Sequence, residues 1–383
     1  MRRTTHARRT GRVGRFLLPA GDGDVIRFFL RNLYVAHGAR MRARRLLIPL
    51  MPGPVRDRLL FATAGLDGET GSTLLERADS AAAQVIDNVA GLAGRVDRRI
   101  VVADASIHAR DRLVFFLFGE RDRPEAVLKI RPLDASGRPL HAEWLALQHL
   151  RRFDRLAGTV PTPVSFLRTD DLEVLAISAL PGTSAYVDMR GRVAPERRAK
   201  LHFSLAADWL ARFHIATRTA EEAATVDRSG IGAGKPSRAL ESQGQPVRRS
   251  CGHGDFWAHN LLLRKHGVLP GVVDWEHFAV EAPCFVDLFH FPFTYGLNYR
   301  WRQAGLEAFR STFLEESALS NAVREYFRRY CVAADLDPAA LPALLRMFLR
   351  LRDESEPSRT VRGVSGADCR RLLDLTRRPA FLP

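Results

Sequence analysis

The chain has 383 residues, of which 46% are hydrophobic and 26% charged, as in a soluble globular protein with a large core. It contains no apolar run of about 18 residues, which argues against a membrane-spanning helix, and its start lacks the pattern of a secretory signal. Four cysteines without a C-x-x-C pair argue against a disulfide framework and favour a reducing compartment, so we expect a cytoplasmic protein.

Positive charge is concentrated at the beginning of the chain. The net charge is +15, and residues 1–58 contain 14 Arg and 3 Asp, a balance of +11. Residues 24–45 combine an apolar stripe with several arginines and predict a basic amphipathic helix. Such a helix either contacts an anionic membrane surface or packs on the protein with its arginines in water, and we favour packing because solvated charge is the common case. No recognition motif for nucleic acid accompanies the charge, so no nucleic-acid partner is expected.

The apolar pattern changes to that of strands after a predicted helix that ends near residue 92. We therefore place a domain boundary near residue 95, which leaves residues 1–94 as a basic, mainly helical N-terminal extension. Strands are predicted at residues 100–103, 113–118 and 126–130. Lys129 lies in the last of them, where a buried ammonium group needs an anionic partner. Residues 140–150 predict a helix with Glu143 on its apolar face, so we expect Lys129 and Glu143 to pair.

Three polar side chains gather in residues 251–278. Two short strands, at residues 261–264 and 268–273, flank a turn signal and predict a hairpin. If this hairpin turns about Gly267, Asn260 and Asp274 face each other, with Asp255 in the loop just before. Hard oxygen ligands of this kind suit Mg²⁺ together with a catalytic base. A zinc site made of Cys251, His253 and His259 is a weaker alternative, because no second pair of residues has ligand spacing.

The spacing of these polar residues carries a family resemblance. His253-x-Asp255-x4-Asn260, followed by Asp274-Trp275-Glu276, resembles the signature of the aminoglycoside phosphotransferase and choline kinase family. The resemblance covers about residues 95–350. It implies an α+β, bilobal protein kinase-like fold, with a small antiparallel-sheet N-lobe at residues 95–180 and a mostly helical C-lobe at residues 181–383. Residues 1–94 are then an extra segment.

The resemblance also implies roles for individual residues of the C-lobe, with ATP and Mg²⁺ as cofactors. Asp255 would be the catalytic residue that accepts or orients the proton of a substrate hydroxyl, and His253 would support its loop by hydrogen bonding. Asn260 and Asp274 would hold Mg²⁺. Asp287 resembles the structural aspartate that follows the metal triplet in this family.

In the N-lobe, the resemblance implies an ATP site. Lys129, paired with Glu143, would contact the α- and β-phosphates. The backbone groups of Ser178 and Leu180 would bind adenine. Residues 104–109 should cover the phosphates, but residues 95–118 contain no glycine, so Ser106 and ordinary amides would have to bind them.

The expected reaction is transfer of the γ-phosphoryl group of ATP to a hydroxyl of a small molecule, such as a sugar, an amino alcohol or a glycoside. Arginines in residues 218–248 and in the last helices disfavour a cationic antibiotic and favour a neutral or anionic metabolite. A kinase-like binding module, weakly catalytic or inactive, is the alternative that the glycine-free loop permits. A protein kinase is disfavoured, because the interval from Glu276 to Asp287 leaves little room for an activation segment.

Overall fold

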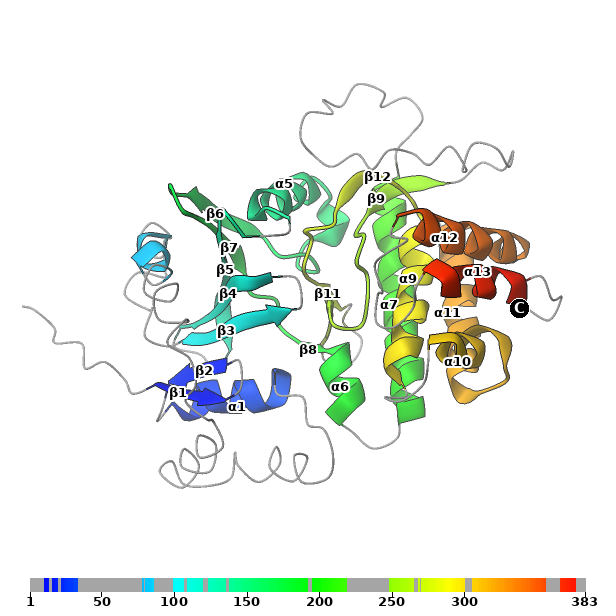
Figure 1. The fold of residues 1–383 in the computed structure, drawn as a ribbon, viewed down its shortest axis with the longest axis horizontal. Helices are drawn as coiled ribbons and strands as arrows, with labels where there is room; N and C mark the ends of the chain where they lie inside the picture. Colours follow the sequence, from blue (N-terminus) through cyan, green and yellow to red (C-terminus); the bar gives the residue numbers. More distant parts are fainter. Residues whose placement is uncertain are drawn as a thin grey trace, which may run out of the picture. The chain divides into compact units, whose positions relative to one another are not determined.

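The computed structural model describes two compact units, which are treated separately below (Figure 1). One unit comprises Met1–His149 and Val160–Thr183, and the other comprises Leu150–Thr159 and Ser184–Pro383. Within them, the described residues are 10–13, 16–19, 22–33, 78, 80–85, 99–106, 109–119, 123–135, 138–191, 195–218, 248–264, 268, 270–299, 305–355 and 366–376. The predicted α+β class, with an antiparallel N-terminal sheet and a helical C-terminal part, is confirmed.

The N-terminal unit is built on a seven-stranded antiparallel sheet of order β1-β2-β3-β4-β5-β7-β6. Its strands are β1 (Thr10–Val13), β2 (Phe16–Pro19), β3 (Arg99–Ser106), β4 (Ala109–Phe118), β5 (Pro124–Pro132), β6 (Pro163–Arg168) and β7 (Leu172–Ser178). Side chains alternate along β4, so Leu113, Phe115 and Leu117 pack with the helical residues 80–85. Val114 and Phe116 instead pack with helix α1 (Gly23–Asn32).

Helix α1 bears on two expectations about the beginning of the chain, its length and the burial of its apolar face. It begins after the N-cap Asp22, whose side chain accepts from Val25 N at 3.2 Å, and it is much shorter than the predicted helix at 24–45. Residues 34–45 lie outside the described residues. Its apolar side chains are buried against the sheet (Val25, Ile26, Phe29 and Leu30). Helix α1 therefore packs on the protein, as the favoured alternative expected. The apolar face of α1 is not available to a membrane.

The described residues that precede the predicted boundary near residue 95 pack with the N-terminal sheet. Strands β1 and β2 pair into the same sheet as β3, and α1 shares a core with β3 and β4. The described part of residues 1–94 thus belongs to the N-terminal unit. Conversely, Leu150–Thr159 groups with the C-terminal unit. None of the described helices is long and apolar enough to cross a membrane.

The C-terminal unit is mainly helical. Its helices are α6 (Ala185–Gly191), α7 (Pro195–Ala216), α9 (Phe285–Tyr299), α10 (Gly305–Phe309), α11 (Ala318–Ala334), α12 (Leu341–Ser355) and α13 (Gly366–Leu375). Two short antiparallel strand pairs complete it, β9 (Arg249–Gly252) with β12 (Ala279–Pro283) and β10 (Leu261–Leu263) with β11 (Gly271–Val272). Aromatic rings fill the core around α7, where the ring centroids of Trp209 and Phe256 are 5.4 Å apart. The loop that follows β9 is thereby packed on α7.

Candidate active site

The loop after β9 contains a glycine that no other residue could replace without strain. Gly254 has a φ of 79°, in the left-handed region, and a Cβ placed on it would clash with the carbonyl oxygen of His277. Its neighbours His253 and Asp255 are the two residues that the motif places in catalysis. The tight conformation at Gly254 therefore fixes how these two side chains diverge from the loop.

His253 is buried with both ring nitrogens engaged. Its Nε2 lies 3.0 Å from the carbonyl oxygen of Val273, and its Nδ1 accepts from Asp255 N at 3.2 Å. A carbonyl can only accept, so Nε2 carries the hydrogen and the imidazole is neutral. Burial lowers the pKa of His253, which favours the same form. His253 is thus a positioning residue that ties the loop to Val273, and it does not fit the role of a proton donor or acceptor for substrate.

Asp287, near the start of α9, holds the loop from the other side. Its Oδ2 accepts from His253 N at 2.6 Å, and its Oδ1 accepts from Gly254 N at 3.0 Å. Burial alone would raise the pKa of this carboxyl, but the nearby His214 and His253 and the backbone N–H of His253 outweigh it and lower the pKa. Asp287 is therefore an ionised, buried anchor, which agrees with the structural aspartate that the sequence suggests.

We expect Asp287→Asn to lower the free energy of unfolding by about 3 kcal/mol at pH 7, because two hydrogen bonds to a charged acceptor are weakened. A carboxyl whose pKa is lowered on folding stabilises the protein above its ordinary pKa and loses that effect as the pH falls. The difference between wild type and the variant should therefore shrink below about pH 4. Urea unfolding at pH 7 and at lower pH measures it, and a difference that stays constant with pH would contradict this role.

Asp255 carries the carboxylate that the motif assigns to catalysis. Its Oδ1 lies 3.2 Å from His290 Nε2, and its Oδ2 accepts from Asn260 Nδ2 at 3.2 Å. The side chain is 36% exposed, so it is accessible to a bound molecule. Burial would raise its pKa, but the hydrogen bond from His290, together with the electrostatic influence of the imidazoles of His290, His253 and His277, lowers it below its ordinary value. Asp255 is therefore ionised at neutral pH and oriented from two sides.

His290 is a site residue that the sequence analysis missed. It lies on α9, and Arg352 Nη1 of α12 lies 3.3 Å from its Nδ1. Because a guanidinium can only donate, Nδ1 accepts and Nε2 carries the hydrogen that points at Asp255. The Arg352 guanidinium is itself held over Phe293 and Phe348, 5.2 Å and 5.8 Å from the ring centroids. The sequence did contain one indication of this role: His290 comes three residues after Asp287, which places the two on the same face of a helix.

The hairpin that carries Asn260 and Asp274 forms with a slightly different register from the predicted one. Leu261 pairs with Val272, and Val273 N donates to the carbonyl oxygen of Asn260 at 3.0 Å. The residue opposite Asn260 is therefore Val273, and the expectation that Asp274 faces it directly was wrong by one position. Asp274 comes next along the chain with a φ of 70°, an uncommon conformation for a residue other than glycine. Such strain is often found at functional positions.

The donor set at this hairpin fits a magnesium ion. Asn260 Nδ2 donates to the main-chain oxygen of Asp255 at 3.0 Å and to its Oδ2 at 3.2 Å, so the amide is oriented and its Oδ1 is the oxygen left for a cation. Asp274 adds carboxylate oxygens, and Mg²⁺ takes one or two such ligands with water and phosphate completing its shell. Among the described residues, no group of three or more His, Cys, Asp or Glu side chains is arranged as a metal site.

In the N-terminal unit, the expected contact between Lys129 and Glu143 is present. Lys129 Nζ lies 2.7 Å from Glu143 Oε2 and 2.9 Å from Oε1, and the carboxylate is fully buried. Glu143 lies on α5 (Leu140–Leu150), whose first amide, Leu140 N, donates to Glu173 Oε2 at 2.9 Å. Glu173 also pairs with Arg131 at 3.5 Å. Strand β7 thus fixes the start of α5, and the helix presents Glu143 to the lysine of β5.

The remaining expectations for the N-lobe concern backbone groups. Ser106 pairs with Ala109 at the end of the β3–β4 ladder. Most of the expected phosphate loop at residues 104–109 is therefore strand. The side chain of Ser106 lies outside the described residues. Ser178 N already donates to Thr162 O at 2.9 Å, which leaves its carbonyl as the group that could bind adenine. Leu180, in the following turn, is half-buried.

Searches of family models and of curated proteins find no match to this sequence. Among solved structures, an aminoglycoside phosphotransferase from Streptomyces rimosus ATCC10970, in complex with ADP and streptomycin, is 17% identical. The match has a TM-score of 0.39 and covers 58% of this chain and 87% of that one. An aminoglycoside-3'-phosphotransferase of type VIII is 16% identical, with a TM-score of 0.38 and coverage of 76% and 99%.

Proposed function

We propose that the protein is a phosphotransferase that moves the γ-phosphoryl group of Mg²⁺-bound ATP to a hydroxyl group of a small molecule. The observation that carries this proposal is the Asp255 carboxylate, ionised and oriented by His290 and Asn260 on a loop that Asp287 holds. Phosphoryl transfer depends mainly on positioning and on neutralising charge, so a small set of fixed polar groups is sufficient.

Each residue then has a defined task. Asp255 accepts or orients the proton of the acceptor hydroxyl. Asn260 and Asp274 hold Mg²⁺, which when bound neutralises charge on the phosphates. Lys129, oriented by Glu143, binds the α- and β-phosphates. His253 acts on the loop and not on substrate.

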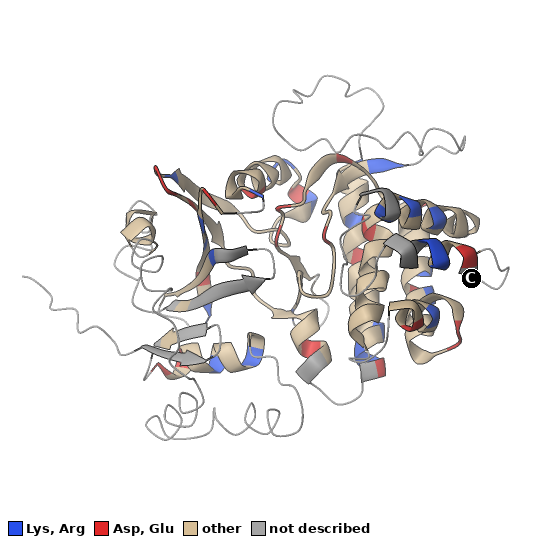
Figure 2. Cartoon of the chain, viewed as in Figure 1, with Lys and Arg blue, Asp and Glu red and all other residues tan. Residues whose placement is uncertain are grey.

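The charges of the C-terminal unit favour an acceptor that is neutral or anionic. Figure 2 marks the positions of Lys and Arg residues along α11, α12 and α13. Arg352 is also bound to His290, which contacts the catalytic carboxylate. A cationic acceptor would be repelled by such a site, whereas a sugar, a glycoside or an anionic metabolite would not. We therefore propose an acceptor of this second kind.

One observation favours a second candidate, a kinase-like module that binds a nucleotide or another ligand without fast turnover. Strands β3 and β4 pair as far as Ser106 and Ala109, and the hairpin contains no glycine that would let its amides approach a phosphate closely. A module that binds nucleotide would differ from the phosphotransferase in turnover, and a module that binds another ligand would differ in binding as well.

The deciding experiment is Mg²⁺-dependent formation of ADP by the purified protein in the presence of candidate acceptors. The panel contains sugars, glycosides, choline, ethanolamine, homoserine and aminoglycosides. Turnover on one class that disappears in Asp255→Asn supports the phosphotransferase and names the acceptor. Binding of ATP and Mg²⁺ without turnover on any class points to an acceptor outside the panel or to a module that binds nucleotide. The absence of nucleotide binding rejects the phosphotransferase and leaves a module that binds another ligand.

Substitution of His290 tests whether this residue orients the Asp255 carboxylate and lowers its pKa. We expect His290→Leu to lower kcat about tenfold with little change in KM, because a hydrogen bond that orients the catalytic carboxylate is lost. Loss of that bond also raises the pKa of Asp255, so the acidic limb of the kcat profile should move to higher pH. His290→Gln keeps a donor and should restore most of the activity. An unchanged pH profile in His290→Leu would contradict this role.

A further inference from the structure

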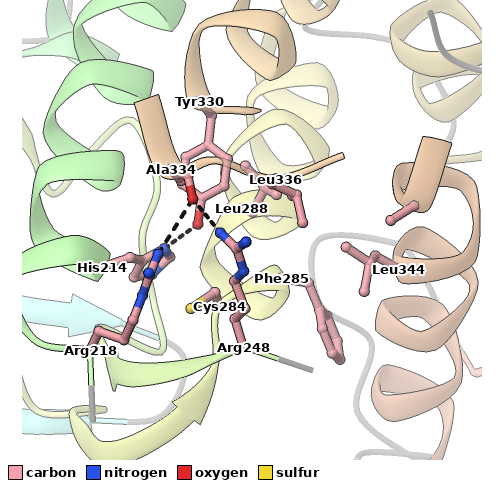
Figure 3. Close-up of a pocket in the computed structure, with 11 residues that line it drawn as sticks. His214, Arg218, Arg248, Cys284, Phe285, Leu288, Tyr330, Ala334, Leu336 and Leu344 are labelled. Atoms are coloured by element: carbon pink, nitrogen blue, oxygen red, sulfur yellow. Dashed lines mark hydrogen bonds between the residues drawn. The ribbon is translucent and has the colours of Figure 1, made fainter. Parts of the chain in front are cut away.

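A cavity with a volume of about 80 Å³ lies in the C-terminal unit, apart from the residues assigned above to catalysis (Figure 3). The C-terminal end of α7, the start of α9, α11 and α12 contribute to its wall. The lining residues are His214, Arg218, Arg248, Cys284, Phe285, Leu288, Tyr330, Ala334, Leu336, Ala340 and Leu344. No carboxylate is among them.

Two arginines form the polar part of the cavity. Arg218 and Arg248 both donate to the carbonyl oxygen of Ala334, the last residue of α11, and Figure 3 shows their guanidinium groups converging on it. One arginine would be enough to satisfy a carbonyl at the end of a helix. Two guanidinium groups drawn to one oxygen repel each other. Asp335 compensates little, since its carboxylate is fully exposed and lies 3.7 Å from Arg248.

The rest of the wall is mainly apolar. Phe285, Leu288, Leu336 and Leu344 face the same space as the arginines. A water molecule needs about 10–15 Å³ of such volume, so the cavity has room for a molecule of roughly five to eight non-hydrogen atoms. A cationic end and an apolar end in a space of this size match a short amphipathic anion.

We propose that this cavity binds a small organic anion, with its carboxylate or phosphate group on Arg218 and Arg248 and its apolar chain against Phe285, Leu288 and Leu344. The proposal stands independently of the phosphotransferase function, because none of these residues takes part in that reaction. Arg218 and Arg248 each retain further N–H groups beyond the one given to Ala334, and these groups bind the anion.

The cavity adjoins the anchor of the catalytic loop through His214. Its Nδ1 lies 2.7 Å from the hydroxyl of Tyr330, and its Nε2 is buried with no hydrogen-bond partner among the described residues. That Nε2 lies 4.0 Å from Asp287 Oδ2, the atom that accepts from His253 N. A ligand beside His214 therefore changes the packing next to the hydrogen bonds that hold the loop.

The test uses the full chain and four probes: hexanoate, propyl phosphate, inorganic phosphate and hexylamine. We expect hexanoate and propyl phosphate to raise the Tm in a saturable way, since a ligand that binds the folded state stabilises it. In Arg218→Gln/Arg248→Gln the dissociation constant should rise at least about tenfold, because charge-assisted hydrogen bonds are lost. Arg328→Gln is the matched control, since Arg328 is an exposed arginine of α11 that pairs with Glu325 on its own helix.

Leu344→Trp fills the apolar end and should weaken binding of hexanoate and propyl phosphate while leaving both arginines in place. Amide hydrogen exchange localises the site independently of activity: hexanoate should alter the exchange of the His253 and Gly254 amides, which donate to Asp287. Equal stabilisation by hexylamine, or equal binding by the double-arginine variant, overturns the proposal. Equal binding of inorganic phosphate and propyl phosphate, unaffected by Leu344→Trp, also overturns it, because the apolar chain then has no place in the cavity.

Discussion

Asp255→Asn is expected to lower kcat about 10²- to 10⁴-fold, the range typical of a lost general base. Asparagine has nearly the same shape, so it can keep a contact with His290 or Asn260, but it carries no charge and cannot accept a proton from an acceptor hydroxyl. The loop itself should remain in place, because its anchors are Asp287 and His253 and not the carboxylate of Asp255. Single-turnover measurements with saturating ATP separate the chemical step from binding.

The control for Asp255→Asn is Asp170→Asn, which removes an exposed carboxylate from the N-terminal unit and should leave kcat unchanged. Nucleotide affinity measured with ADP and Mg²⁺ should be similar in wild type and in Asp255→Asn, since Asp255 does not belong to the residues that hold either group. Retention of more than about a tenth of the wild-type kcat would show that another group takes the proton and would remove Asp255 from its proposed role.

The residues that could be predicted from the sequence are those whose neighbours lie close by in the chain or whose charge requires a partner. Asp255, Asn260 and Asp274 lie within one short hairpin region, and their spacing alone indicated an oxygen-rich site. Lys129 and Glu143 were predictable for a related reason, since a charge in an apolar strand and one on an apolar helix face must both be neutralised. Their contact, at 2.7 Å, is the one that this reasoning requires.

The parts that could not be predicted depend on residues far apart in the chain. His290 becomes a site residue because its Nδ1 meets Arg352, which comes 62 positions later, and no local pattern specifies that contact. The packing of α1 on the sheet depends in the same way on Ile100 and Phe118. The register of the β10–β11 hairpin was missed for a different reason: it depends on the geometry of the turn, and a turn signal fixes the position of a hairpin less closely than its existence.

Glu143→Leu is expected to lower the free energy of unfolding by about 3–5 kcal/mol, because it leaves the Lys129 ammonium buried without its carboxylate. The double variant Lys129→Met/Glu143→Leu replaces both charges by apolar groups of similar volume and should recover most of that loss. Urea unfolding of the wild type, both single variants and the double variant gives the coupling energy directly.

The pH dependence of Lys129→Met distinguishes a lost ion pair from a general packing defect. In this variant Glu143 stays buried without its cation, so its pKa in the folded state rises above its unfolded value. Such a group favours the folded state at low pH and loses that effect as the pH rises, so the deficit of Lys129→Met should be smaller at pH 5 than at pH 8. The double variant has no carboxyl at this position and should show no such trend. A double variant that regains stability but lacks ATP-dependent turnover would show that Lys129 and Glu143 serve phosphate binding and not folding. A double variant as active as the wild type would exclude Lys129 from the ATP site.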